Sequence, residues 1–411
     1  MSADNLPVLV GRAAVSAAGP RFEDLWQAAC EGKDGLRVEG PTPYDTEGFR
    51  GSRACWLQPS LRERLLKDTG PLLPVSRLLI DVAQQAISDA TNRSLADLGA
   101  DRSRWGIWLG TSLGGIGTWA DQHAEVVLAP KDAPARVVDT GMGYSAPARD
   151  LARALGVGGP VATVTTACCS ATVATGQAAD ALRRGEVDVA LVCGVDLLSR
   201  FVHAGFEILG ALSEDDQRPF SEQRDGLWLG EGAAVAIFVR NASCSGGTHG
   251  QDRVAVAGSG LAGDALRLTG PDMEGGGLLR SVHQALSQAG LQASDLSAIS
   301  AHGTATELND AMEMAAFSTL LEGRVSDVPV HGIKPILGHT LGASGLFELL
   351  VLERAMREGL FPGTPGEGPD DPACRLWVHR GEPLSSDLPV CLSTNSAFAG
   401  NNAALVLRRL G

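Results

Sequence analysis

The chain has 411 residues, more than one ordinary domain, so two domains or one fused double domain are expected. Hydrophobic residues make up 44% of the chain, which is enough for a large core. The formal net charge of −14 argues against nucleic acids and anionic membrane surfaces as general partners.

The eight cysteines show neither the spacing of a disulfide framework nor a metal-ligand pattern with the histidines. The N-terminal segment lacks the basic start of a signal peptide, and no apolar run reaches membrane-spanning length. We therefore expect a soluble, reduced, cytoplasmic protein without a metal site.

Apolar periodicity and turn residues predict alternating strands and helices in the first half of the chain. Strands are expected over residues 6–15, 105–112, 161–167, 187–195 and 227–240. A loop is expected over 41–60, and helices over 22–31, 61–67, 76–92, 147–155 and from beside Cys168 to 184. The run 187–195 is apolar throughout, which is typical of a strand buried on both faces of a parallel sheet.

The polar, glycine-rich segment 241–252 predicts a boundary between two halves, 1–245 and 246–411. The second half repeats the alternation, with a loop over 362–372. Its strands are expected over 254–258, 296–301, 328–332, 390–393 and 403–410, and its helices over 277–289, 310–321 and 342–358. Two such halves imply a layered α/β architecture with mostly parallel sheets.

Cys168 lies where a β-branched strand ends and a helix of small residues begins. The unsatisfied N–H groups and the positive dipole end of a helix favour thiolate over thiol. A buried cysteine is also often just a small core residue. The junction alone therefore leaves both interpretations open.

Two histidines follow predicted strands in the second half. His302 comes directly after Ala301, and His339 follows the strand ending near Val330, with Lys334 five residues before it. Parallel α/β folds gather their active sites at the carboxyl ends of strands. One histidine in such a turn is usually a hydrogen-bonded loop residue, but two together with Cys168 indicate an active site.

These residues can carry out acyl transfer with carbon–carbon bond formation. The Cys168 thiolate can attack a thioester and hold the acyl group. Two histidine N–H groups can stabilise an enolate oxygen while a β-carboxylate leaves as carbon dioxide, and backbone N–H groups near Cys168 can hold the later oxyanion. Lys334 can orient the cluster and lower the pKa of a neighbouring histidine. A hydrolase would need a carboxylate partner for one histidine, and the motifs contain none.

Two further segments allow a structural and a functional interpretation. The small-residue segment 392–402 is either a tight turn or a backbone oxyanion donor with a movable aromatic gate, Phe398. The segment 217–232 contains Arg218, Arg224 and Glu231, for which turn formation and ion pairing are favoured over a catalytic role.

Together these motifs resemble the β-ketoacyl-acyl carrier protein synthases (ketosynthases), the type II condensing enzymes of fatty-acid and polyketide synthesis with the thiolase fold. The resemblance spans nearly the whole chain. It is carried by 8–16, Thr166-Ala-Cys, Arg218-Pro-Phe, Arg224-Asp-Gly, Gly230-Glu-Gly, His302-Gly-Thr-Ala-Thr, Lys334 to His339, and the end from Asn395-Ser to Asn402-Ala.

The resemblance implies roles for the catalytic residues. Cys168 would be the acylated nucleophile, and His302 and His339 the decarboxylation and condensation pair. Lys334 would be the associated lysine. The activity implied is that of an acyltransferase of the 3-oxoacyl-acyl carrier protein synthase type.

The resemblance also implies the surroundings of the site. Glu348 would support it, Thr304 and Thr306 would contact the phosphopantetheine arm, and Phe398 would be the gate. The implied fold is a five-layered αβαβα sandwich of two similar halves, normally a dimer. No metal or dissociable redox cofactor is implied, because phosphopantetheine on the acyl carrier protein holds the substrates.

The chain departs from the family pattern at several positions. Cys169 stands where another small residue is common, so packing is favoured, with a second nucleophile as the alternative. Glu307 replaces a residue that is often proline, and the loop 213–217 is shortened. The terminal turn around Phe398 is one residue shorter than usual, which leaves the gate residue and chain-length control open.

The main expected partner is acyl carrier protein, which is typically acidic, as this chain is. Docking would then use local positive charge, for which Arg62, Arg64, Lys67 and Arg77 are the candidates. A solvated helix face is an equal alternative for them. No nucleic-acid or membrane partner is expected, and both a homodimer and a heterodimer with a second ketosynthase-like subunit stay open.

We therefore predict a decarboxylative Claisen condensation between an acyl chain on Cys168 and malonyl-acyl carrier protein. Secondary metabolism is favoured over housekeeping fatty-acid synthesis because of the altered gate turn and the compact chain. One alternative is a non-catalytic subunit like a chain-length factor, although such subunits usually lose the cysteine. Another is an acyltransferase that uses the same pocket without condensation. A thiolase would use a second cysteine in place of one histidine.

Overall fold

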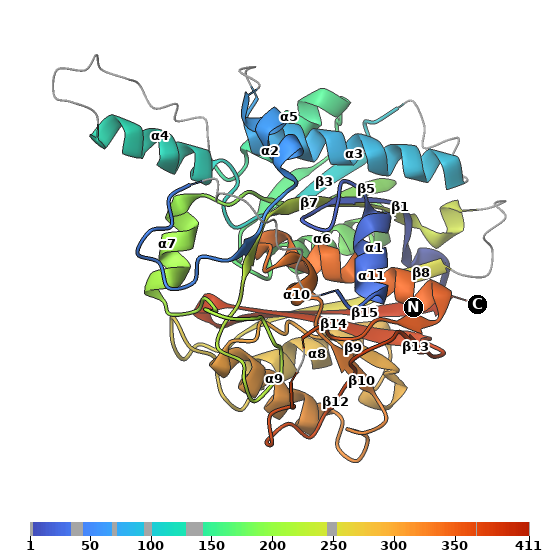
Figure 1. The fold of residues 1–411 in the computed structure, drawn as a ribbon. Helices are drawn as coiled ribbons and strands as arrows, with labels where there is room; N and C mark the ends of the chain where they lie inside the picture. Colours follow the sequence, from blue (N-terminus) through green and yellow to red (C-terminus); the bar gives the residue numbers. More distant parts are fainter. Residues whose placement is uncertain are drawn as a thin grey trace.

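The computed structural model describes residues 3–33, 44–67, 72–93, 101–128, 143–244, 253–366 and 368–410. They form alternating layers of helices and strands (Figure 1). The predicted half boundary at 245 and 246 lies outside these residues. Within the described ranges, each helix is too short or too polar to cross a membrane.

The two halves of the chain contribute strands in the same spatial order. In the first half the order is β1-β7-β5-β3-β4, formed by Pro7–Val15, Gly232–Arg240, Val189–Asp196, Trp105–Gly110 and Val161–Val164. In the second half it is β8-β15-β14-β9-β10, formed by Arg253–Gly263, Asn401–Leu410, Val390–Ala397, Ala298–Ser300 and Pro329–His331. If the five strands of each half are numbered 1 to 5 along the chain, their order across the sheet is 1-5-4-2-3 in both halves. The halves therefore share one sheet topology.

Strand direction within each half is mixed. β7 and β15 run antiparallel to both of their neighbours, whereas β3 and β9 run parallel to theirs. The prediction of mostly parallel sheets is therefore wrong. An apolar run such as β5 carries no information on direction, because helices cover both of its faces whichever way its neighbours run.

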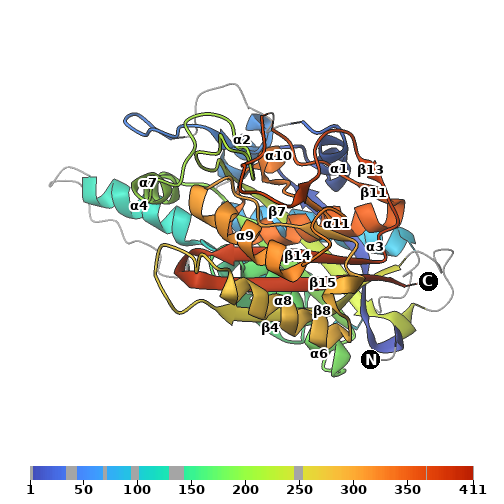
Figure 2. The ribbon, with the colours of Figure 1, turned by 90° about the horizontal axis from the view of Figure 1, so that it is seen from below.

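The helices form two outer layers and one shared middle layer. α3 (Pro74–Arg93) and α5 (Ala146–Leu155) pack against the first-half strands, and α8 (Gly276–Ala289) and α9 (Glu307–Leu320) cover the second-half strands, as seen from below in Figure 2. α6 (Ser170–Arg183) and α11 (Ser344–Glu358) lie between and contact strands of both halves. Within the described chain, the hydrogen-bonded link between the two sets of strands is one residue pair, Val8–Ala255. The expected αβαβα order is confirmed.

The predicted helices and longer strands appear within a few residues of their expected ends, but α4 (Ile116–Leu128) and α7 (Arg200–Ile208) lie outside the predicted set. The strand expected over 161–167 ends at Val164. The other short elements are α1 (Phe22–Cys30), α2 (Pro59–Lys67), α10 (Lys334–Leu337), β2 (Ala54–Cys55), β6 (Leu229–Gly230), β11 (Leu360–Phe361), β12 (Trp377–Val378) and β13 (Leu384–Ser385).

A close contact between Gly110 and α6 positions the start of that helix. A Cβ atom at Gly110 would lie 2.3 Å from the backbone nitrogen of Ala171 and 2.4 Å from its Cα. Glycine therefore lets the first turn of α6 rest directly on the end of β3. Cys168, two residues before this helix, is placed by the same contact.

Gly110→Ala should lower the free energy of unfolding by about 2 kcal/mol or more, because the obstructing atoms belong to the backbone and cannot rotate away. Urea unfolding followed by circular dichroism measures this change. Gly205→Ala in α7 is the matched control: apart from its chain neighbours and the backbone of its own helix, no described atom lies within 4 Å of its Cβ position, so alanine should stabilise by up to about 1 kcal/mol. An unchanged midpoint for Gly110→Ala would contradict the proposed positioning of α6.

Candidate active site

Cys168 lies in the turn between β4 and α6. Ala167 just before it has a φ of +52°, and Cys169 just after it is the N-cap of α6. A left-handed alanine costs about 1 kcal/mol or more, and here it turns the chain into the helix. The Cys168 side chain is buried at this junction.

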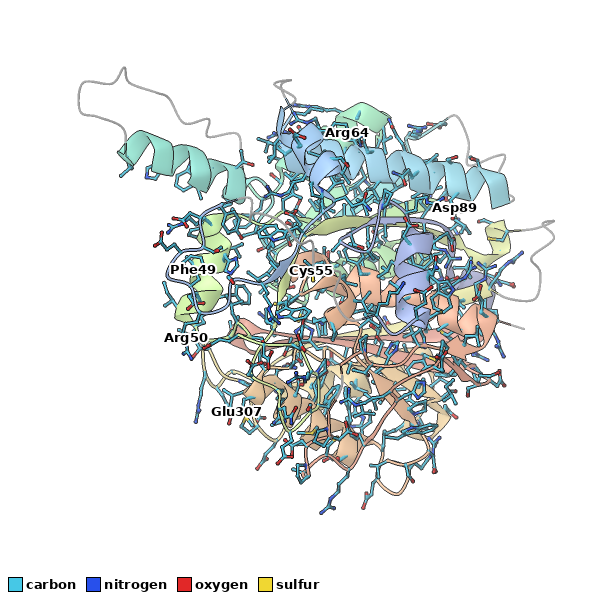
Figure 3. All side chains as sticks on the ribbon, viewed as in Figure 1. Phe49, Arg50, Cys55, Arg64, Asp89 and Glu307 are labelled. Carbon is cyan, nitrogen blue, oxygen red and sulfur yellow. The ribbon has the colours of Figure 1, made fainter. Side chains whose placement is uncertain are left out.

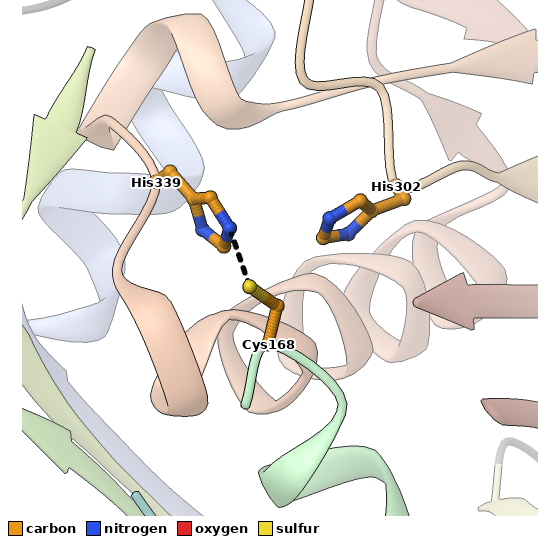
Figure 4. Close-up of side chains that lie close together, drawn as sticks. All are labelled: Cys168, His302 and His339. Atoms are coloured by element: carbon orange, nitrogen blue, oxygen red, sulfur yellow. Dashed lines mark hydrogen bonds between the residues drawn. The ribbon is translucent and has the colours of Figure 1, made fainter. Parts of the chain in front are cut away.

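The structure brings His302, which follows β9, and His339, which follows the short helix α10, to Cys168. His339 Nε2 lies 3.0 Å from Cys168 Sγ, and the two imidazole rings are 5.2 Å apart and nearly perpendicular. Figure 4 shows both rings directed toward the sulfur. The three residues that sequence analysis singled out therefore share one site, although they are far apart along the chain.

Burial sets the protonation states of these groups. Burial and the nearby Lys334 charge lower the pKa of both His302 and His339 well below the usual range, so both rings are neutral near pH 7. Burial raises the pKa of the Cys168 thiol to about 12, against the opposing effect of Lys334. The helix start favours thiolate over thiol, and desolvation of the buried sulfur opposes that preference in the resting protein.

The hydrogen bonds of His302 fix its tautomer. Its Nδ1 lies 3.0 Å from Lys334 Nζ and 3.1 Å from Asn395 Nδ2. The Asn395 amide is oriented by its bonds to Glu348 Oε2, at 2.7 Å, and to the Thr172 hydroxyl. Because both neighbours of Nδ1 can only donate, neutral His302 carries its proton on Nε2. His302 is thus a hydrogen-bond donor toward the pocket.

His339 has more freedom than His302. Its Nδ1 lies 2.9 Å from the Ser344 hydroxyl, which can donate or accept a hydrogen bond and itself contacts the Thr340 hydroxyl at 3.1 Å. His339 Nε2 can therefore accept the proton of Cys168 in one tautomer and donate a hydrogen bond in the other.

Lys334 and Glu348 form a buried ion pair behind His302. Lys334 Nζ lies 2.5 Å from Glu348 Oε1 and also donates to the His302 carbonyl oxygen. Together with the bond to His302 Nδ1, this satisfies all three ammonium protons. A buried pair of this kind contributes little net stability, but removing one partner leaves a charge that is costly to bury.

Two buried carboxylates that the sequence analysis missed hold the catalytic turns. Glu313 on α9 accepts hydrogen bonds from the backbone N–H groups of His302, at 2.7 Å, and Gly303, at 2.8 Å. Asp196 at the end of β5 accepts from Leu113 N and Gly342 N, both at 2.8 Å. Burial raises the pKa of Glu313 to about 7 and that of Asp196 to about 6. Asp196 is a polar residue directly after the apolar run 187–195. The same pattern, a polar residue at the end of a buried strand, indicated His302.

A pocket opens above Cys168 and encloses about 970 Å³, including its solvent-filled mouth. Thr304 and Thr306 line it, with their hydroxyls 2.9 Å apart. Phe398 also lines it and packs against Phe206 of α7, with ring centroids 5.8 Å apart. Phe206 belongs to a helix outside the predicted set, so its place beside the gate candidate could not be anticipated.

Cys169 points away from the pocket. It is fully buried, and its Sγ lies 3.1 Å from each of two carbonyl oxygens, those of Asn395 and Asn401. Burial raises its pKa well above the usual value. These contacts favour the packing role over a second nucleophile.

Two of the arginines singled out in the sequence form ion pairs within the fold. Arg224 pairs with Asp371 at 2.5 Å, consistent with a structural role for 217–232. Arg62 pairs with the buried Glu231 at 2.9 Å and is itself only 14% exposed. Arg62 is therefore corrected from docking candidate to structural residue.

The docking candidates Arg77 and Arg64 differ in their exposure to solvent. Arg77 directs its guanidinium to the carbonyl oxygens of Leu65 and Leu72, so it too is occupied within the fold. Arg64 is exposed. The side chain of Lys67 lies outside the described residues.

The neutral state of both histidines is a testable property. Because their pKa values are lowered, the ring nitrogen resonances of His302 and His339 should not titrate between pH 8 and pH 6 in ¹⁵N NMR of histidine-labelled protein. His302 should show a protonated Nε2 and an unprotonated Nδ1. The variants His302→Ala and His339→Ala assign the signals. A titration midpoint near pH 6.5, or the opposite His302 tautomer, would contradict the geometry.

Comparison with known proteins gives the family. The model for the β-ketoacyl synthase N-terminal domain matches residues 8–243, and that for the C-terminal domain matches residues 254–366. A similar curated protein is 3-oxoacyl-(acyl-carrier-protein) synthase 2 of Staphylococcus aureus strain COL, which is 28% identical over 100% of this chain and 99% of the relative. Nodulation protein E of Rhizobium sp. strain N33 is 36% identical over 65% of this chain and 66% of its own length.

Solved structures agree. A chain of "the ishigamide ketosynthase/chain length factor" superposes with a TM-score of 0.86 at 29% identity and covers 99% of both chains. A chain of the AntDE:AntF complex of a type II ketosynthase with its acyl carrier protein gives a TM-score of 0.87 at 23% identity, again over 99% of both, and supports the fold alone. On the two family matches, which together span most of the residues, the chain belongs to the β-ketoacyl synthase family.

Proposed function

We propose that this chain is a condensing enzyme that joins an acyl group held on Cys168 to malonyl-acyl carrier protein by decarboxylative Claisen condensation. The observation that carries the proposal is the meeting of one thiol and two neutral imidazoles in one pocket, with His339 Nε2 3.0 Å from Cys168 Sγ. The similarity to 3-oxoacyl-(acyl-carrier-protein) synthase 2 supports it.

The first half-reaction is transfer of the acyl group to Cys168. The sulfur forms a bond to the acyl carbonyl carbon as the carbon–sulfur bond of the incoming thioester breaks. The thiol proton moves to His339 Nε2 and then to the departing phosphopantetheine thiolate, so the half-reaction needs no net proton. Backbone N–H groups beside Cys168 stabilise the oxyanion formed on the way.

The second half-reaction makes the carbon–carbon bond. The malonyl carboxylate leaves as carbon dioxide, and its bonding electrons form an enolate whose oxygen accepts hydrogen bonds from Nε2 of both His302 and His339. The enolate carbon attacks the acyl carbonyl on Cys168, and the carbon–sulfur bond to the enzyme breaks. The β-ketoacyl product leaves on its carrier, and the Cys168 thiolate regains a proton from solvent.

The surrounding residues take supporting roles in this proposal. Lys334 and Glu348 hold His302 in its donor tautomer, and Thr304 and Thr306 offer hydroxyls to the phosphopantetheine arm. Phe398, resting on Phe206, acts as the gate over the acyl pocket.

No metal ion takes part in the proposed chemistry. The ligand atoms of Cys168, His302 and His339 lie within 4.8 Å of one another, close enough for a zinc ion to bridge. The Lys334 ammonium, 3.0 Å behind the His302 ring, opposes a second cation there. We propose that phosphopantetheine is the carrier of both substrates and that no dissociable redox cofactor is used.

The biosynthetic role is proposed to be secondary metabolism. The grounds are the short gate turn around Phe398 and the compact chain of 411 residues. The intact cysteine and both histidines argue against a non-catalytic subunit.

The acylation step is tested by intact-protein mass spectrometry after exposure to acyl carrier thioesters. Wild type and Cys169→Ala should gain one acyl mass, and Cys168→Ala should gain none, because only Cys168 faces the pocket.

Release of carbon dioxide from malonyl-acyl carrier protein should fall by at least about a hundredfold in His302→Ala, which removes an enolate hydrogen bond. Acylation without carbon dioxide release would favour the non-condensing acyltransferase. Acylation lost only in Cys169→Ala would move the nucleophile.

The chain is also proposed to work as a dimer through the edge strand β4. On the described chain β4 pairs with β3 alone, its four residues carry no charge, and Val161 is 44% exposed. Such an uncharged edge readily pairs with another strand.

Light scattering should give twice the chain mass of 42.6 kDa for wild type and the single-chain mass for Val161→Lys. Leu261→Lys, on a leucine that is 45% exposed in β8, is the control that should stay dimeric. A monomeric wild type would favour a heterodimer with a second subunit.

A further inference from the structure

The short helix α7 has little buried surface of its own, although it carries Phe206. Its buried residues are Val202 and His203, whereas Phe201 is 60% exposed and Ile208 is 86% exposed. A helix of nine residues is not stable by itself in water, so its position depends on contacts with other segments. α7 therefore needs a support outside its own sequence.

Residues 44–51, here called the strap, lie along α7 and bind its C-terminal end. The Glu207 carboxylate accepts hydrogen bonds from the backbone N–H groups of Arg50, at 2.9 Å, and Gly51, at 3.2 Å. A Cβ atom at Gly51 would lie 2.4 Å from Leu212 Cβ, so the strap rests directly on the chain just after the helix. Hydrogen bonds to a carboxylate are stronger than those between neutral groups, which makes Glu207 a firm point of attachment.

The strap also binds the N-terminal end of α7. Arg200 Nε donates a hydrogen bond to the Asp45 carbonyl oxygen at 3.0 Å, and the guanidinium carbon of Arg200 lies 5.5 Å from the centre of the Phe49 ring. Figure 3 shows Phe49 and Arg50 beside this helix. One segment of the chain therefore holds both ends of α7.

His203, in the middle of α7, is hydrogen-bonded to the strap through both ring nitrogens. Its Nε2 lies 2.7 Å from the Gly51 carbonyl oxygen, and its Nδ1 lies 3.0 Å from the Tyr44 hydroxyl. Burial lowers the pKa of His203, so the ring is neutral near pH 7. Because a carbonyl oxygen can only accept, Nε2 carries the ring proton and Nδ1 accepts a hydrogen bond from Tyr44.

α7 in turn supports the gate candidate Phe398. Phe206 lines the pocket, and its ring centroid lies 5.8 Å from that of Phe398 and 6.3 Å from that of His339. Phe206 and Tyr44 also pack against one hydrophobic cluster that includes Val202. An outward shift of α7 would therefore move Phe206 away from the gate ring and widen the pocket beside Cys168.

We propose that the strap sets the largest acyl group that Cys168 accepts, by holding α7 so that Phe206 backs the Phe398 ring. This rests on the proposed function, since the gate acts on acyl groups that reach Cys168. Glu207 and His203 are positioning residues in this proposal, because they act through Phe206. A pocket wall discriminates against each methylene group that it excludes, so a small displacement of Phe206 changes the acyl preference.

The acyl preference is tested with Tyr44→Phe and Glu207→Gln, which weaken the hydrogen bonds of the strap and keep the side-chain shapes. Intact-protein mass spectrometry gives the rate constants for acylation of Cys168 by hexanoyl-pantetheine and dodecanoyl-pantetheine. The ratio of dodecanoyl to hexanoyl rate should rise at least about fivefold in each variant, because the loosened wall admits the longer chain. Glu47→Gln, on an exposed carboxylate of the strap, is the matched control and should leave the ratio within about twofold of wild type.

A double-mutant cycle shows whether the strap acts through Phe206. Phe206→Ala alone should raise the same ratio. Adding Tyr44→Phe or Glu207→Gln to Phe206→Ala should change the ratio less than about twofold further, because the strap then has no ring to hold in place. Fully additive shifts would overturn the proposal.

Hydrogen exchange measures the hold on α7 without any substrate. The backbone amides of residues 200–209 should exchange at least about tenfold faster in Tyr44→Phe and Glu207→Gln than in wild type, while those of α6 stay unchanged. Unchanged exchange in α7 would mean that the strap does not position this helix. Faster exchange throughout the chain would mean general destabilisation. Either result would overturn the proposal.

Alkylation of Cys168 separates the strap proposal from the proposed function, because it needs no acyl transfer. Peptide mass analysis gives the rates with iodoacetamide and with the longer N-octyl-iodoacetamide. The ratio of the longer to the shorter reagent should rise at least about fivefold in Tyr44→Phe and Glu207→Gln. If this ratio rises but no thioester acylates wild type, the strap proposal stands and the proposed function fails. Ratios that stay unchanged in both acylation and alkylation would overturn the strap proposal.

Discussion

The buried Lys334 ammonium is the constraint on which the site depends. An unpaired ammonium in the interior costs several kcal/mol, so its three protons must find partners. They find Glu348 on α11, the His302 ring nitrogen and the His302 carbonyl oxygen. Satisfying one charge therefore holds together the turn after β9, the start of α10 and the middle-layer helix α11. The bond from Lys334 to the His302 ring also sets the tautomer of His302. The hydrogen bonds that make burial of the ammonium possible therefore also determine how His302 can act in the reaction.

Backbone strain is concentrated in the turns that carry the reacting groups. Six non-glycine residues of the described chain have positive φ, and four of them are next to or within three residues of Cys168, His302, His339 or Phe398. The four are Ala167, Ala305, Leu341 and Ala399. Each costs about 1 to 3 kcal/mol and persists only because the surroundings fix it. Two carboxylates help to hold these turns: Glu313 accepts a hydrogen bond from Gly303 N, and Asp196 accepts one from Gly342 N.

Much of the fold and of the catalytic set could be predicted because the signals are local. Apolar runs and helical periodicity indicate most elements, and a polar residue directly after a buried strand indicates His302. The same signal marks Asp196. What could not be predicted depends on distant contacts or on backbone geometry: the direction of β7, the positive φ of alanines, and the pairing of Arg62 with Glu231 across 169 positions. The opposing effect of burial on the Cys168 thiol could not be predicted either, because the extent of burial is a property of the finished fold.

The placement of Lys334 favours decarboxylation over simple binding of a malonyl group. Among the described residues, the pocket walls include His302 and His339, while the lysine that polarises them stays behind the rings. The charged residues of the wall are Asp264 and Glu307, both acidic. A bound malonyl carboxylate would thus meet neutral donors and negative charge, so its ground state gains little. The enolate that forms as carbon dioxide leaves gains two imidazole hydrogen bonds. Because these hydrogen bonds strengthen only as the carboxylate is lost, they lower the barrier to decarboxylation. A cation in the pocket wall would stabilise the bound carboxylate and so raise that barrier.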